Sequence, residues 1–131
     1  MAEVFSFPVT VYYEDTDFSG VVYHANYLKY FERAREEILG VQALAQLYHT
    51  QGLGFVVHHL ALKYRASAVH ADVLDIRTSI HVASEYRAVF KQGAYRADHT
   101  HALVEGNIDL VCINNHKQLV ALPQFFLQRF G

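Results

Sequence analysis

The sequence predicts an α+β fold in which one long helix accompanies a sheet of five strands. Two observations carry this prediction. One stretch has apolar residues at helical spacing, and five stretches are rich in apolar, β-branched and aromatic residues in a strand-like pattern. The helical stretch follows the first strand and precedes the other four, so strands and helices do not alternate regularly. The predicted strands cover residues 5–13, 55–64, 73–83, 86–96 and 103–114.

The first strand and the long helix are the clearest elements. In residues 5–13 the apolar Val9, Val11 and Tyr13 alternate with Thr10 and Tyr12, and Pro8 lies near the start, where a missing N–H is tolerated. The helix begins at about residue 26 and is roughly 21 Å long. It ends at Gly40, because glycine adopts a positive φ without penalty. Its apolar face carries Tyr27, Phe31, Ala34 and Ile38, and its opposite face carries Lys29, Glu32, Arg33, Glu36 and Glu37.

The segment between the helix and the second strand is less regular. Leu44, Leu47 and Tyr48 predict a short second helical turn that ends near Gly52 and Gly54. In residues 55–64, simple alternation would place Phe55, Val57, His59, Ala61 and Lys63 on one face. The other face would then carry Val56, His58, Leu60, Leu62 and Tyr64.

The remaining strands follow the same pattern. In residues 73–83 the apolar set should face the helix: Leu74, Ile76, Thr78, Ile80 and Val82. Residues 97–100 form a turn after the fourth strand. Gly106 in the last strand marks a bulge or a close approach of backbone. Pro123 suits the first turn of a short C-terminal helix over residues 124–129.

Composition limits the class of protein. The 131 residues fit a single domain, residues 1–131, and 52% of them are hydrophobic, which is ample for a core. A net charge of −2 gives no overall field that would attract nucleic acid. One cysteine excludes an internal disulfide. The N-terminus lacks the pattern of a signal peptide, and no window reaches transmembrane length, so we expect a cytoplasmic protein.

An acidic turn just before the long helix is the strongest candidate site. Asp17 lies a few residues ahead of the helix N-terminus, where unpaired backbone N–H groups carry partial positive charge. Such an end stabilises a developing oxyanion, and a carboxylate beside it is a minimal apparatus for acyl transfer. The alternative is that Asp15 or Asp17 only shapes the turn and caps local N–H groups.

The same stretch resembles a family signature. Residues 13–17, YEDTD, and residues 20–27, GVVYHANY, closely resemble the motif of YbgC-like acyl-CoA thioesterases, in the 4-hydroxybenzoyl-CoA thioesterase branch of the hotdog fold. The resemblance extends from about residue 5 to about residue 130 and is weaker after residue 62. Relatives often carry a proline in the segment that matches residues 63–68, where this chain has none.

The resemblance implies a fold, a reaction and a site. A curved antiparallel five-stranded sheet would wrap around the long helix, and the protein would hydrolyse an acyl-CoA to a free acid and coenzyme A. Asp17 would be the nucleophile or general base, and the His24 N–H at the helix N-terminus would polarise the thioester carbonyl. Tyr13, Gly20, Val21, Tyr23 and Asn26 would bind substrate.

The resemblance also implies partners. No metal or cofactor would be needed, since coenzyme A is part of the substrate. The strand after the long helix would pair with its copy, giving a homodimer or a homotetramer built as a dimer of dimers. The alternative function is a non-catalytic module that binds acyl carrier protein or is associated with the Tol-Pal envelope system. A hotdog dehydratase would need a different placement of histidine and carboxylate.

Other chemistry-bearing residues have simpler explanations. His58 and His59 are adjacent in a strand, and His99 and His101 lie at a turn with no evident carboxylate or cysteine set, so we expect no metal site. Cys112 lies in an apolar strand and is interpreted as a small buried hydrophobe.

Overall fold

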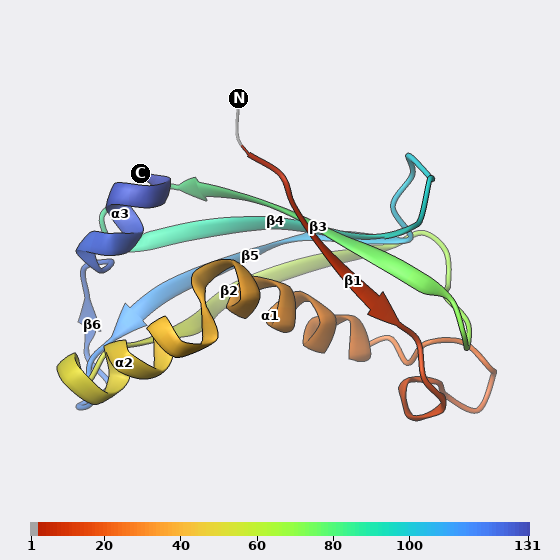
Figure 1. Cartoon of the computed structure of the whole chain (residues 1–131), viewed down its shortest axis with the longest axis horizontal. Helices are drawn as coiled ribbons and strands as arrows, with labels where there is room; N and C mark the ends of the chain where they lie inside the picture. Colours follow the sequence, from red (N-terminus) through yellow and green to blue (C-terminus); the bar gives the residue numbers. More distant parts are fainter. Residues whose placement is uncertain (1–2) are drawn as a thin grey trace.

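The computed structural model describes residues 3–131 and shows a curved antiparallel sheet with two consecutive helices on its inner side (Figure 1). A single turn of 3-10 helix, Tyr13–Asp15, lies between the first strand and the first helix. The other elements follow in this order: β1 (Phe5–Thr10), α1 (Asn26–Leu39), α2 (Val41–Gln51), β2 (Gly54–Tyr64), β3 (Val73–Val82), β4 (Arg87–Arg96), β5 (Val104–Ile113), β6 (Leu119–Val120) and α3 (Gln124–Phe130).

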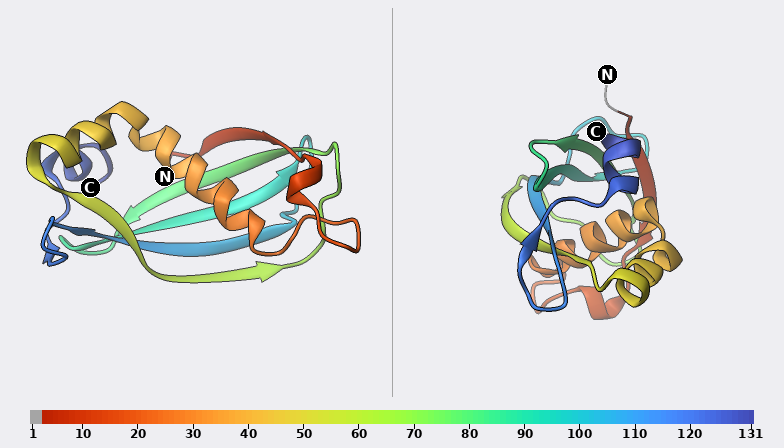
Figure 2. Two further views of the ribbon diagram at one scale, coloured as in Figure 1. Left: turned by 90° about the horizontal axis from the view of Figure 1, so that it is seen from below. Right: turned by 90° about the vertical axis from the view of Figure 1, so that its left-hand side faces the viewer.

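The strands are arranged in the order β1-β3-β4-β5-β2, and the two-residue β6 pairs with the end of β5. All of the pairings are antiparallel. The end-on view in Figure 2 shows α1 inside the curve of this sheet. The predicted sheet of five strands is therefore confirmed, and β6 adds a short sixth strand that the sequence pattern did not indicate.

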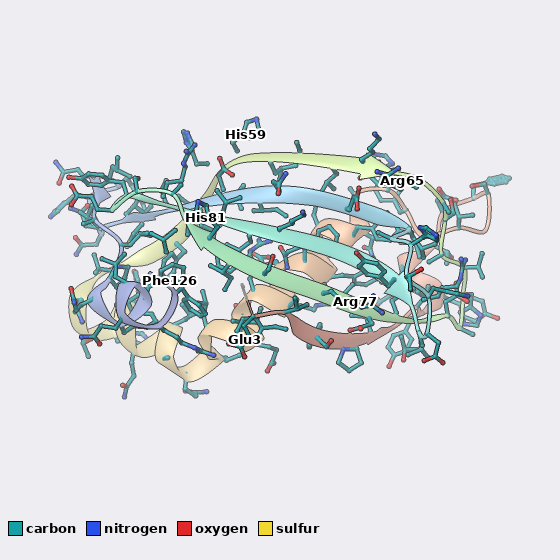
Figure 3. All side chains as sticks on the ribbon, turned by 90° about the horizontal axis from the view of Figure 1, so that it is seen from above. Glu3, His59, Arg65, Arg77, His81 and Phe126 are labelled. Carbon is teal, nitrogen blue, oxygen red and sulfur yellow. The ribbon has the colours of Figure 1, made fainter. Side chains whose placement is uncertain are left out.

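The core lies between α1 and the inner face of the sheet. The helix contributes Tyr27, Tyr30, Phe31 and Ala34, each of which is at most 2% exposed. Leu74, Ile76 and Thr78 on β3 are buried against it, as predicted for that face. Cys112 is also buried in this core, so its interpretation as a small hydrophobe is confirmed, and burial raises the pKa of its thiol. Figure 3 shows the opposite, outer face, with α1 behind the strands.

The first two helices test the predicted helix end at Gly40 and the predicted helical turn that follows it. The long helix begins at Asn26 and ends at Leu39, and Gly40 has a φ of 97° with its N–H donated to the Glu36 carbonyl, as expected for a glycine stop. The expected short second turn is instead an 11-residue helix, α2. It begins directly after Gly40, because the Leu44 N–H bonds to the Gly40 carbonyl. Gly40 therefore ends α1 with its N–H and begins α2 with its carbonyl.

The first strand is shorter than predicted. β1 ends at Thr10 rather than at residue 13, because the chain turns at Tyr12. The Asp15 carboxylate accepts a hydrogen bond of 2.9 Å from the Tyr12 N–H, and the Asp15 N–H bonds back to the Tyr12 carbonyl. This reciprocal pair forms the 3-10 turn and starts the acidic loop two residues earlier than expected.

A β-bulge in β2 changes which side chains face the helix. The register with β5 shifts between Val57, which is opposite Leu110, and His59, which is opposite Asp109. The extra residue, His58, reverses the alternation beyond it. Residues directly opposite one another share a face, so the inner face of β2 carries Phe55, Val57, Leu60, Leu62 and Tyr64. The two faces predicted by simple alternation were therefore wrong beyond residue 57.

Gly106 is a point of close approach, as predicted, although the bulge lies elsewhere. A Cβ at this position would lie 2.1 Å from the Ala61 carbonyl oxygen of β2 and 2.6 Å from a methyl carbon of Leu62. We expect Gly106→Ala to lower the free energy of unfolding by about 1–3 kcal/mol, because backbone must shift to admit the methyl group. Chemical denaturation measures this change.

The control for this prediction is Gly54→Ala in the strand that pairs with β5. A Cβ on Gly54 meets no heavy atom within 4 Å, so its effect should stay within about 0.5 kcal/mol. Equal stability of the two variants would contradict the close approach at Gly106.

Candidate active site

The loop between β1 and α1 is tied to the helix by Asp15. Its carboxylate accepts hydrogen bonds from the Asn26 side-chain amide at 2.7 Å and from the Tyr12 N–H at 2.9 Å. Its carbonyl accepts a third from the Tyr23 N–H at 2.8 Å. Burial alone would raise the pKa of Asp15, but the hydrogen bonds to its carboxylate, chiefly those from Tyr12 and Asn26, outweigh burial and lower it. Asp15 is therefore an ionised anchor of the loop, a role that the sequence pattern suggested for either acid.

Asp17 sits at the bend of this loop. One carboxylate oxygen, Oδ1, accepts hydrogen bonds from the Ser19 hydroxyl at 2.7 Å and the Ser19 N–H at 2.8 Å. These bonds to Ser19 are the main cause of a lowered pKa, and the backbone N–H of Val21 and the nearby His24 add to the same effect. The other oxygen, Oδ2, makes no hydrogen bond with residues 3–131. Asp17 thus shapes the turn with one oxygen, and the other oxygen of the ionised carboxylate has no hydrogen-bond partner among residues 3–131.

Gly20 forms the tight bend that orients the backbone of Asp17. Its φ is 86°, a conformation that L side chains rarely adopt, and its N–H bonds to the Asp17 carbonyl at 3.1 Å. The Asp17 N–H in turn bonds to the Val21 carbonyl at 2.8 Å. Gly20 and Val21 therefore hold the backbone of Asp17.

His24 lies at the start of α1 in a tight turn. The Asn26 N–H bonds to the Tyr23 carbonyl at 2.8 Å, which makes His24 the first central residue of a four-residue turn. The His24 carbonyl accepts the Tyr64 hydroxyl at 2.8 Å. Its own N–H makes no hydrogen bond in the described part of the chain. This free N–H points to a place for an anion or a polarised carbonyl oxygen at the helix N-terminus.

The other predicted substrate-binding residues have different environments. Tyr13 is 80% exposed and stacks on His70, with ring centroids 4.1 Å apart. The ring of Tyr23 lies against that of His24 at 4.5 Å. Asn26 is buried, and its amide is engaged with Asp15, so in this structure it supports the loop. Asp17, Gly20, Val21, Tyr23 and His24 lie together in one short segment.

Two side chains at this end of α1 were not singled out by sequence as parts of the site. Tyr64 comes from the end of β2 and reaches the His24 carbonyl, a contact between residues 40 positions apart. Tyr30 is fully buried, and its hydroxyl has no hydrogen-bond partner in the described chain. Burial and, after it, the neighbouring Asp15 raise the pKa of this phenol. A tyrosine at the end of an apolar strand was the only signal for Tyr64.

A groove runs along α1 on the side that faces β2, and we call it the α1–β2 groove. It consists of a hollow of about 190 Å³ beginning at Leu28 and a hollow of about 440 Å³ extending to α2. Both hollows are lined by Glu32, Arg35 and Val57. Neither includes Asp17 or His24, which lie beyond the Leu28 end. Residues 3–131 contain no group of three or more metal-binding side chains, and no helix among them is long and apolar enough to cross a membrane.

Comparisons with known proteins identify a family that this chain matches over most of its length. A family model described as the thioesterase-like superfamily matches residues 11–130. An acyl-CoA thioesterase YbgC of Haemophilus influenzae is 42% identical over 123 residues, which are 92% of this chain and 89% of that protein. An acyl-CoA thioester hydrolase YbgC of Escherichia coli O6:H1 is 38% identical over 129 residues, 97% of this chain and 96% of that protein.

Solved structures extend the likeness to the fold. A probable thioesterase from Bartonella henselae has a TM-score of 0.84 and 33% identity, and the match covers 92% of this chain and 100% of that one. A 1,4-dihydroxy-2-naphthoyl-CoA thioesterase from Synechocystis has a TM-score of 0.87 and 25% identity, covering 96% of this chain and 94% of that one. The hotdog arrangement expected from the motif is confirmed.

Proposed function

Because the chain belongs to the thioesterase-like superfamily, we propose that it hydrolyses acyl-CoA thioesters with Asp17 and the His24 N–H as its reactive groups. The enzyme is an acyl-CoA thioester hydrolase, as its relatives are named. The observation that carries the assignment of residues is that one short loop holds both an ionised carboxylate and a backbone N–H at the start of α1 that makes no hydrogen bond within residues 3–131.

The His24 N–H acts on the carbonyl of the thioester. As a nucleophile adds, negative charge develops on the carbonyl oxygen, and a fixed N–H donor at a helix N-terminus stabilises that charge. The Tyr64 hydroxyl, by holding the His24 carbonyl, keeps this peptide in place. The histidine ring, exposed at the loop, is free to orient water or substrate.

Asp17 supplies the electron pair or removes the proton. As a nucleophile, Oδ2 attacks the carbonyl carbon, the C–S bond breaks, coenzyme A leaves as the thiol after protonation, and water hydrolyses the resulting anhydride. As a general base, Asp17 takes a proton from water while the water oxygen attacks. Both routes give the free acid and coenzyme A. A thioester is already activated, so neither route requires a metal or prosthetic group.

The proposed reaction is tested with a panel of acyl-CoA molecules of different lengths, including aromatic acyl groups, by following release of the coenzyme A thiol. Turnover of at least one acyl-CoA, lowered at least about a hundredfold in the Asp17→Asn variant, is the expected result. Binding of acyl carrier protein without turnover of any substrate would contradict the proposal and favour an interaction module.

The activity should persist to a lower pH than an aspartate of ordinary pKa would allow. Because hydrogen bonds from Ser19 lower the pKa of Asp17 below its ordinary value of 3.8, the catalytic carboxylate stays ionised until the pH falls below that value. We expect the acid limb of kcat/KM to lie below about pH 4. Ser19→Ala removes the 2.7 Å hydroxyl bond, so the pKa should rise and the acid limb should move to higher pH.

Ser19→Thr is the matched control for the pH profile, since it retains a hydroxyl and the backbone N–H. The acid limb of kcat/KM for Ser19→Thr should lie at the same pH as that of the unmodified protein. An acid limb that is unchanged in Ser19→Ala would show that a group other than Asp17 controls the profile.

We also propose that the working enzyme contains at least two copies of the chain. β2 lies at the end of the sheet, so its outer edge pairs with no other strand of residues 3–131. Val57, Leu60 and Tyr64 on this strand are 43%, 37% and 47% exposed. An unpaired apolar edge of this length favours pairing with another strand, and a second β2 would extend the sheet and cover the α1–β2 groove. Sedimentation should show a dimer or tetramer; an active monomer at working concentration would refute this.

A further inference from the structure

Arg35 is a buried cation that has no anionic partner among residues 3–131. It lies on α1, is 7% exposed, and lines both hollows of the α1–β2 groove. The four ion pairs among residues 3–131 do not include it. Burial lowers the pKa of its guanidinium, with only a weaker opposing effect from Glu32. A buried charge of this kind is costly unless a group of opposite charge meets it.

The guanidinium is held in place by a neutral network. Arg35 Nη1 donates to Gln92 Oε1 at 2.9 Å. Gln92 Nε2 donates to the Phe31 carbonyl and to Thr78 Oγ1, both at 3.0 Å. The amide of Gln92 is thus oriented from two sides and offers its oxygen to the arginine. This network fixes the position of the guanidinium but does not balance its charge.

The free side of the guanidinium matches a carboxylate. Arg35 Nε and Nη2 make no hydrogen bond with the described residues. These two donors form one edge of the planar group, which suits the two oxygens of a carboxylate. Glu32 and Glu36 line the same groove but are exposed, and neither lies within ion-pair distance of Arg35.

The groove beside Arg35 suits the apolar part of an acyl group. Its walls include Leu28, Leu60 and Ile108 near the site, and Leu39, Phe55 and Leu110 farther along. Leu28 lies one helical turn after His24. Because Gln92 bonds both the Phe31 carbonyl and Arg35, the guanidinium lies near the level of Phe31. At 1.5 Å per residue this is roughly 10 Å from His24 along the axis.

We propose that the α1–β2 groove binds an acyl group whose far end carries a carboxylate, and that Arg35 binds this carboxylate. The inference rests on the proposed thioesterase function, because it takes the thioester to lie at His24. An extended chain advances about 1.2 Å per bond, so roughly 10 Å corresponds to about eight bonds. The preferred substrates are therefore medium-chain acyl-CoA molecules with a terminal carboxylate.

Binding of thioether analogues tests the proposal without hydrolysis. Calorimetry would compare S-alkyl-coenzyme A of about nine carbons with the analogue of equal length that ends in a carboxylate. The native protein should bind the carboxylate analogue about ten- to a hundredfold more tightly, as expected for hydrogen bonds to charged groups. Arg35→Gln should abolish this preference. Arg33→Gln, a change of the same type at an exposed position two residues away, should retain it.

If Arg35→Gln fails to fold, the relative affinity of the native protein for the two analogues still tests the proposal. Equal binding of the two analogues by the native protein would overturn the proposal, and so would a preference that survives in folded Arg35→Gln. Arg35→Lys, which keeps the charge but loses the two-pronged donor edge, should show a reduced preference.

Hydrolysis assays separate this inference from the proposed function. Turnover of unsubstituted acyl-CoA together with no carboxylate preference would refute the Arg35 site alone. A carboxylate preference in binding, with no turnover of either substrate, would support the Arg35 site and refute the thioesterase. If a second copy of the chain supplies the anion, the native protein should show no preference, and this also overturns the proposal.

Discussion

Asp17→Asn should give a folded protein whose turnover is lowered at least about a hundredfold, because loss of a general base alone removes two to four decades of rate. The amide oxygen can still accept both hydrogen bonds from Ser19, which hold the bend at 2.7 and 2.8 Å. The shape of the loop is therefore retained. The amide cannot attack a thioester effectively or take a proton from water. Steady-state kinetics on the best acyl-CoA measures the loss.

Asp15→Asn is the matched control for this variant. Asn26 and Tyr12 donate to different oxygens of the Asp15 carboxylate, so the single amide oxygen can keep only one of these two hydrogen bonds and the anchor is weakened rather than removed. We expect a smaller loss of turnover than in Asp17→Asn. A non-hydrolysable acyl-CoA analogue should still bind Asp17→Asn, because Asp17 acts on the reacting carbonyl. Near-normal turnover by a folded Asp17→Asn protein would remove the central residue of the proposed mechanism.

A single turnover in heavy-oxygen water distinguishes two roles of Asp17. Label that appears in the Asp17 carboxylate would support an anhydride intermediate opened at the enzyme carbonyl. An unlabelled Asp17 carboxylate is expected both for general-base catalysis and for an anhydride that water opens at the substrate carbonyl. This experiment does not distinguish those two routes.

Local patterns in the sequence were enough to predict most of the fold. The long helix, its stop at Gly40 and the inner face of β3 follow from periodicity and from the conformational freedom of one glycine. The choice of a sheet curved around the helix came from the motif resemblance, because periodicity reports which face is buried and not which strands pair. The segment from Asp17 to His24 was predicted as a site because it is continuous in sequence.

The features that were missed depend on contacts between distant residues. The bulge at residue 58 appears only when β2 is paired with β5, and it moves Leu60, Leu62 and Tyr64 to the inner face. Arg35 lies four residues after Phe31 on the buried side of α1, yet a charged residue there carries no apolar signal. Its partner Gln92 is 57 residues away, so the polar network could not be inferred from spacing.

His24→Pro should lower turnover about a hundredfold or more, whereas His24→Ala should cost much less. Proline has no N–H, so it removes the proposed oxyanion donor, a loss typically worth a factor of about 100 to 1,000 in kcat. Alanine keeps the N–H and removes only the imidazole. Turnover of the two variants on one acyl-CoA therefore separates the backbone from the side chain.

The local structure accommodates the proline. His24 is the first central residue of a turn closed by the Asn26 N–H at 2.8 Å, a position that favours proline, and its own N–H makes no hydrogen bond in residues 3–131. Circular dichroism and sedimentation should thus match those of the native protein. If folded His24→Pro and His24→Ala are equally impaired, the imidazole rather than the N–H is the catalytic group. If His24→Pro keeps near-native turnover, the oxyanion donor must be a different group, and the next candidate is the N–H of Ala25, which also makes no hydrogen bond within residues 3–131.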